Sequence, residues 1–136
     1  MIDKYRSIHI ERLDHLVLTV RDLDVTTEFY VSVLGMEKVT FSEGRTALKF
    51  GNQKINLHQY GHEFSPSAIR PQPGSADLCF ITNSPLSSVI KHLETCEVVI
   101  IQGPVERTGA VGTIQSVYFR DPDQNLLEVS NYKTSA

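Results

Sequence analysis

A carboxylate stands in the middle of an otherwise apolar stretch near the end of the chain, NLLEVSNY at residues 125–132. Leu127 and Val129, which flank Glu128, indicate a buried β-strand. An ionised carboxylate in an apolar interior needs a partner, because without one it is strongly destabilising or takes up a proton. Glu128 therefore either faces water on the polar side of a half-buried strand or binds a cation.

The elements that must position such a group are predicted to occur twice in the same order. The first half predicts a strand over 10–20, a helix over 22–36 and three short strands ending near residue 60. The second half predicts a strand over 76–82, a helix over 84–96 and strands over 97–102, 113–119 and 125–132. Between them, residues 61–75 contain three prolines and two glycines and are predicted to be a linker.

This repeat predicts a single α+β domain over residues 1–136. Its two βαβββ modules, about 10–60 and about 76–132, are expected to pair into a curved eight-stranded trough around one cleft.

The repeat also predicts which side chains meet in the cleft. Matching DHLVLTV to ADLCFIT makes His15 equivalent to Asp77, and matching INL to LEV makes Asn56 equivalent to Glu128. His58 lies two residues after Asn56 on the same strand face. Because the opening and closing strands of both modules would line one cleft, imidazole, carboxylate and amide groups are brought together. This combination is typical of a divalent metal site.

With these residues in place, the sequence resembles the vicinal oxygen chelate superfamily of glyoxalases, bleomycin-resistance proteins and ring-cleaving dioxygenases. The matching stretches are LDHLVLTVRDLDVTTEFYVSVLGM near the start and FRDPDQNLLEV near the end. KINLHQ, GPVERTGAVG and IQSVYFRDPDQNLLEVSNY are similar to the group of glyoxalase domain-containing protein 5 and its bacterial relatives. The resemblance implies paired βαβββ modules around a divalent metal ion, and it implies a homodimer.

Carried over by position, the resemblance implies His15, Asp77 and Glu128 as metal ligands, with His58 as a further candidate. Asp77 stands where many members have a histidine, and Asn56 stands where bacterial glyoxalase I has a glutamate. Asn56 and His58 are about 6.5–7 Å apart along one strand face, so they cannot fill the same coordination position. Position favours Asn56 and ligand strength favours His58.

Two questions about this ligand set stay open in the sequence. His58 either reaches the metal or orients the substrate. If Asn56 is not a metal ligand, it is expected to bind the substrate. One imidazole with two carboxylates suits Ni, Zn, Mn, Co or Fe, and the sequence does not choose among them.

These residues predict a metal-dependent glyoxalase-like lyase or isomerase that acts on a small substrate with vicinal oxygens through a stabilised enolate. Glu128 and Asp77 are the expected catalytic residues. Arg107, in the glycine-rich segment GPVERTGAVGT that is predicted to be a mobile flap, is expected to bind a substrate carboxylate or phosphate. The alternatives are a non-heme iron dioxygenase using His15, His58 and Glu128, and a metal-free binding protein of the bleomycin-resistance kind.

The composition agrees with a soluble single domain, since 40% of the 136 residues are hydrophobic and 21% are charged. A net charge of -3 without a basic run argues against nucleic-acid or membrane-surface partners. The two cysteines predict free thiols in a reducing compartment, with Cys79 as a small core residue. The N-terminal segment has no apolar run typical of a signal peptide, so we expect a cytoplasmic location.

Overall fold

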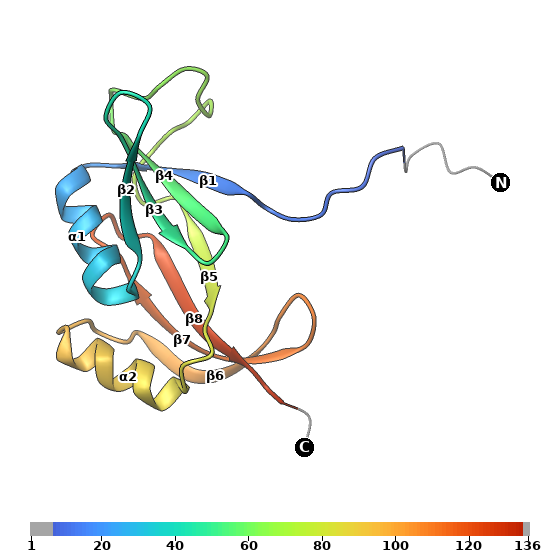
Figure 1. Ribbon diagram of the computed structural model, residues 1–136. Coiled ribbons are helices and arrows are strands. Elements are labelled where there is room, and N and C mark those ends of the chain that lie inside the picture. Colours follow the sequence, from blue (N-terminus) through green and yellow to red (C-terminus); the bar gives the residue numbers. More distant parts are fainter. Residues whose placement is uncertain (1–6, 135–136) are drawn as a thin grey trace.

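The chain folds into two βαβββ modules in a computed structural model that describes residues 7–134 (Figure 1). Residues 1–6 and 135–136 lie outside the described part. The first of these ranges belongs to the N-terminal segment that was predicted not to be a signal peptide. The first module comprises β1 (His15–Val20), α1 (Leu23–Leu34), β2 (Glu37–Phe41), β3 (Arg45–Phe50) and β4 (Gln53–Gln59). The second comprises β5 (Asp77–Ile81), α2 (Leu86–Thr95), β6 (Gln102–Thr108), β7 (Thr113–Arg120) and β8 (Leu126–Tyr132). The predicted α+β fold class is confirmed.

The eight strands form two four-stranded sheets with the same topology, β1-β4-β3-β2 and β5-β8-β7-β6. In each sheet the opening strand pairs in parallel with the closing strand, and the remaining pairs are antiparallel. Val17 pairs with Asn56 in the first sheet, and Cys79 pairs with Glu128 in the second. The register therefore gives Asn56 and Glu128 equivalent places in the two modules.

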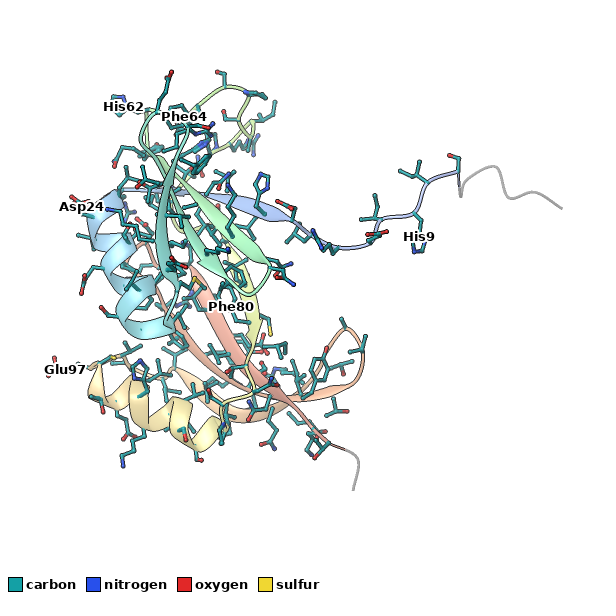
Figure 2. The ribbon with its side chains drawn as sticks, in the orientation of Figure 1. His9, Asp24, His62, Phe64, Phe80 and Glu97 are labelled. Carbon is teal, nitrogen blue, oxygen red and sulfur yellow. The ribbon has the colours of Figure 1, made fainter. Side chains whose placement is uncertain are left out.

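One face of each sheet is buried in a core that both modules share. The core includes Leu18 and Val20 from β1, Leu127 and Val129 from β8, and side chains of both helices. The rings of Phe50 on β3 and Phe80 on β5 meet edge to face with their centroids 5.4 Å apart, so the two sheets touch here; Phe80 is labelled in Figure 2. None of the helices within residues 7–134 is long and apolar enough to cross a membrane.

Because successive strand residues alternate between faces, the remaining side chains of each sheet point away from this core. The first outer face carries the side chains opposite to the core on β1 and β4, namely His15, Val17, Thr19, Lys54, Asn56 and His58. The second outer face carries the equivalent set on β5, β7 and β8, namely Asp77, Cys79, Ile81, Ser116, Tyr118, Glu128, Ser130 and Tyr132. Every candidate metal ligand lies on one of these two faces.

Local sequence signals fix where the helices begin and end. The side chain of Asp22 accepts a hydrogen bond from the Val25 amide at 3.0 Å, and Gly35 ends α1 in the left-handed conformation with φ 67°. At the start of α2, Pro85 occupies the N-cap position and makes no side-chain hydrogen bond to the helix. Asn131 of β8 instead accepts from the first amide of α2, Leu86, at 2.9 Å. The helix is thereby tied to its own sheet.

The turn DPDQN between β7 and β8 also joins the two modules. Buried Asp121 accepts a 2.6 Å hydrogen bond from the hydroxyl of Tyr30 on α1 and a 2.8 Å bond from the Asn125 side chain. Asp123 accepts from the Arg21 amide at 3.2 Å, on the same side of the turn. Burial, and then the charge and hydrogen bond of Asp121, raise the pKa of Tyr30, so its hydroxyl remains a donor.

The segment from 97 to 112 differs most from its prediction. The expected strand over 97–102 is wrong, and the segment expected to be a mobile flap contains strand β6. Gly103 and Pro104 indicate a loop in sequence, yet β6 is an edge strand with a register shift between Gln102 and Val105, where proline is tolerated. A Cβ on Gly103 would collide with the backbone oxygen of Ser116. This glycine therefore permits β6 to approach β7 closely. Arg107 lies on strand β6 and not in a flexible loop.

Candidate functional site

Glu128 lies half-buried on the second outer face, where a hydroxyl holds one of its carboxylate oxygens. The Oγ of Ser116 on β7 donates to Oε2 of Glu128. Ser116 in turn lies 2.6 Å from the Oγ of Ser130, and both serines are fully buried. This arrangement leaves Oε1 of Glu128 as the oxygen available to a ligand.

A hollow of about 370 Å³ lies over this part of the second outer face, and its lining includes Glu128, Cys79 and Arg107. The Nε of Arg107 donates to the Tyr118 hydroxyl at 2.9 Å, which orients the guanidinium along the wall of the hollow. The structure therefore brings together two predicted site residues, Glu128 and Arg107. A fixed guanidinium can bind a carboxylate or phosphate in bidentate fashion.

Cys79 also lies in this hollow, and its prediction as a core residue is wrong. Leu78 and Phe80 of β5 take the core positions, so Cys79 is exposed on the second outer face. Its sulfur is 3.4 Å from the Ser130 hydroxyl. Partial burial raises the pKa of the Cys79 thiol, against the hydrogen bond that Ser130 can donate to the ionised thiolate, and the charge of Glu128 raises it further. The group is therefore a thiol at neutral pH.

His15, at the start of β1 on the first outer face, is oriented by its sequence neighbour. Its Nδ1 lies 2.8 Å from Oδ1 of Asp14, which places the proton on Nδ1 and leaves Nε2 free to bind a metal. The same hydrogen bond lowers the pKa of Asp14. Sequence reasoning missed Asp14, although the adjacent Asp-His pair was visible. Asp77, equivalent to His15, lies exposed at the start of β5.

His58 is buried by the linker, with only 3% of its surface exposed. Its ring lies 5.4 Å from the ring of Phe64, which sits in the linker loop over the first sheet (Figure 2). Nη2 of Arg45 lies 3.3 Å from Nε2 of His58, so the guanidinium donates to a neutral imidazole. Burial and the charge of Arg45 lower the pKa of His58. This geometry argues against metal binding through Nε2 of His58, and a role in orienting the substrate stays a prediction.

Replacing Arg45 with methionine, which keeps the chain length and removes the charge, is expected to raise the pKa of His58. The lowered pKa means that acid destabilises the native protein through His58, with the loss beginning below about pH 6.5, the ordinary value for histidine. In the Arg45→Met variant this loss should be smaller. A proton NMR titration, with His58→Gln to assign the resonance, checks the shift; an unchanged pKa would contradict the assigned contact.

Asn56 presents an amide oxygen that lacks a partner. It is 6% exposed, and its Oδ1 is buried without a hydrogen-bond partner among the described residues. A buried acceptor without a partner is unfavourable and indicates a polar group or ion that residues 7–134 do not supply.

The four positions predicted to surround a metal are brought together in pairs only. His15 and Asn56 share the first outer face, whereas Asp77 and Glu128 share the second. Within residues 7–134 of one chain, no three His, Cys, Asp or Glu side chains are close enough to hold a metal ion. The donor types fit a divalent ion, with one free imidazole nitrogen, two carboxylates and one unpartnered amide oxygen. Each face supplies half of such a set.

Comparison with known proteins places this fold in a family. Residues 12–129 match the Glyoxalase/Bleomycin resistance protein/Dioxygenase superfamily. The chain is 58% identical to "Virulence protein STM3117" of Salmonella typhimurium over 123 residues, which cover 90% of this chain and 85% of that protein. It is 53% identical to "Glyoxalase domain-containing protein RDO1" of Mycosarcoma maydis, covering 94% of this chain and 72% of that protein.

A solved structure agrees with these sequence matches. An integron cassette protein from V. cholerae superimposes with a TM-score of 0.91 at 60% identity, covering 93% of this chain and 98% of that one. The predicted superfamily is thus confirmed, while closeness to the glyoxalase domain-containing protein 5 group stays a prediction. The chain belongs to the Glyoxalase/Bleomycin resistance protein/Dioxygenase superfamily.

Proposed function

We propose that the protein is a metal-dependent, glyoxalase-like lyase or isomerase whose site is shared by two copies of the chain. The observation that carries this proposal is the division of the four donor positions between two outer faces that point away from one core. The first outer face of one chain would meet the second outer face of its partner. In a twofold dimer this pairing creates two equivalent sites.

The exposed apolar side chains support such pairing. Val17 on the first outer face is 45% exposed and Ile81 on the second is 49% exposed. Ile8 and Ile10 are also exposed, on the segment that leads into β1 and runs away from the rest of the chain (Figure 1). Apolar side chains gathered on a sheet face and its leading segment are typical of a protein–protein interface.

His15 and Glu128 are the ligands that we assign first, with Asp77 and the amide oxygen of Asn56 completing the set. A divalent ion held there would polarise two neighbouring substrate oxygens. If substrate oxygens replaced it on the ion, Glu128, with Oε2 still held by Ser116, would present the released Oε1 to accept the proton from the carbon next to the substrate carbonyl. The electron pair of that C–H bond forms a C=C bond as the π pair of the carbonyl moves onto its oxygen. For an α-hydroxycarbonyl, return of the proton to the former carbonyl carbon, with transfer of the α-hydroxyl proton to the other oxygen, completes an isomerisation.

Arg107 supplies the binding energy for an anionic group of the substrate. Its guanidinium lines the same hollow as Glu128 and is held by Tyr118. We therefore expect a small α-hydroxycarbonyl or α-oxo compound that carries a carboxylate or phosphate. Neutral, hydrogen-bonded His58 orients the substrate from the first outer face.

The experiment that tests this function is exchange of a substrate proton with solvent. Protein loaded with Mn²⁺, Ni²⁺ or Zn²⁺ is incubated in D₂O with small α-hydroxycarbonyl and α-oxo acids, and proton NMR follows the α-proton. Removal of that proton by Glu128 predicts deuterium incorporation, which is lost in Glu128→Gln. Oxygen uptake with Fe²⁺ would instead indicate the dioxygenase. Tight binding of ligand without metal and without exchange would indicate the binding protein.

A further inference from the structure

We propose that Ser116 is a positioning residue, which together with Ser130 holds Glu128 in the conformation that binds metal. The inference rests on the proposed function and identifies how the second outer face prepares its ligand. Ser116 lies on β7 and Ser130 on β8, beside Glu128. Both serines are 0% exposed, so their hydroxyl groups cannot exchange these partners for water.

The direction of the hydrogen bonds follows from the number of protons available. A carboxylate only accepts, so Ser116 donates its single hydroxyl proton to Oε2 of Glu128. The 2.6 Å contact between the two hydroxyls must then have Ser130 as donor and Ser116 as acceptor. The thiol of Cys79, 3.4 Å from Ser130, completes the series as donor. Each group thus fixes the rotamer of the next, and the series ends on Glu128.

The first module provides an internal comparison at the same positions. Asn56 is equivalent to Glu128 and His58 to Ser130, while Arg45, on the strand beside His58, corresponds to Ser116. Arg45 and His58 bond to each other, and Oδ1 of Asn56 has no partner in the described part of the chain. Among residues 7–134, therefore, a neighbouring strand side chain holds the candidate ligand by a hydrogen bond in the second module and not in the first. Glu128 is therefore the pre-oriented ligand of the set, and Asn56 is the weaker one.

A carboxylate with one oxygen held has fewer rotamers to lose on binding a cation. Outer partners of metal ligands typically contribute about 10–100-fold to metal affinity. Ser116→Ala is therefore expected to weaken Mn²⁺ binding by about tenfold or more. Ser130→Ala, one step further from Glu128, should weaken binding by a few-fold, and Cys79→Ala should leave it nearly unchanged.

The test is calorimetric titration of Mn²⁺ into wild-type protein and these three variants, with thermal unfolding to verify the fold. The two serines are buried to the same extent, so a merely structural role predicts equal losses for Ser116→Ala and Ser130→Ala. A decline graded along the series supports positioning. Wild-type affinity in folded Ser116→Ala, or equal losses for both serines, would overturn it. If the wild type bound none of Mn²⁺, Ni²⁺ and Zn²⁺, that would overturn the proposed function itself, and this inference with it.

Discussion

Replacement of Glu128 with alanine is expected to lower the affinity of the protein for Mn²⁺ by at least about a hundredfold, more than loss of an outer partner typically costs. The variant removes the carboxylate that we propose as a ligand and that Ser116 holds by a hydrogen bond on the second outer face. Glu128 is the one carboxylate among the described residues that line the hollow, so no neighbouring carboxylate there can replace it. Isothermal titration calorimetry of metal-stripped protein measures the effect directly.

Glu106→Ala is the matched control for this variant. Glu106 lies on the neighbouring strand β6, is 61% exposed and pairs with Lys133 at 2.7 Å. Removing it deletes a carboxylate from the same sheet without touching Glu128, so its Mn²⁺ affinity should equal that of the wild type. Wild-type affinity in Glu128→Ala would exclude Glu128 as a ligand. An equal loss of Mn²⁺ affinity in both variants would mean that the loss comes from the change in net charge and not from removal of a ligand.

Replacement of Asp121 with alanine is expected to destabilise the protein by at least about 3 kcal/mol, because each buried donor left without an acceptor costs about 1–3 kcal/mol. The donors are the Tyr30 hydroxyl, the Asn125 side chain, and the amides of Asp123 and Asn125. They join the turn after β7 to helix α1. Tyr30→Phe removes one donor and should cost about 1 kcal/mol.

Urea unfolding at a fixed protein concentration measures both changes, because self-association would otherwise shift the midpoint. Glu94→Ala, at an exposed site on α2, is the control and should stay within about 0.5 kcal/mol of the wild type. If Asp121→Ala were no less stable than Glu94→Ala, the turn would not join the modules as described.

Much of the fold could be predicted from the sequence because local signals decided it. Asp22 and Gly35 fixed the ends of α1 through a side-chain cap and a left-handed residue. The repeat predicted the equivalence of Asn56 and Glu128, which the strand register reproduces. Strand β6 was missed because glycine and proline locally indicate a loop. Gly103 is needed only because β6 lies close to the backbone of Ser116 on β7, and that contact is visible only in the folded structure.

The supporting residues of the candidate site could not be predicted in the same way. Ser116 and Arg45 are polar residues on ordinary strands, and only the pairing of strands shows that one meets Glu128 and the other His58. Cys79 was misplaced because the apolar stretch DLCFI alternates, with Leu78 and Phe80 turned to the core. The sequence placed the donors around one cleft, but it could not show that each chain divides them between two outer faces.

The most direct test of a shared site is complementation between two inactive variants. His15→Ala and Glu128→Ala each remove one ligand from both sites of a dimer, so each variant alone should bind almost no Mn²⁺. After the two are unfolded together and refolded in equal amounts, half of the dimers would contain both variants and one intact site. We expect recovery of about one quarter of the wild-type Mn²⁺ sites, because half of the dimers have one intact site out of two. Absence of recovery, with mixed dimers verified by mass spectrometry, would contradict a site built from two chains.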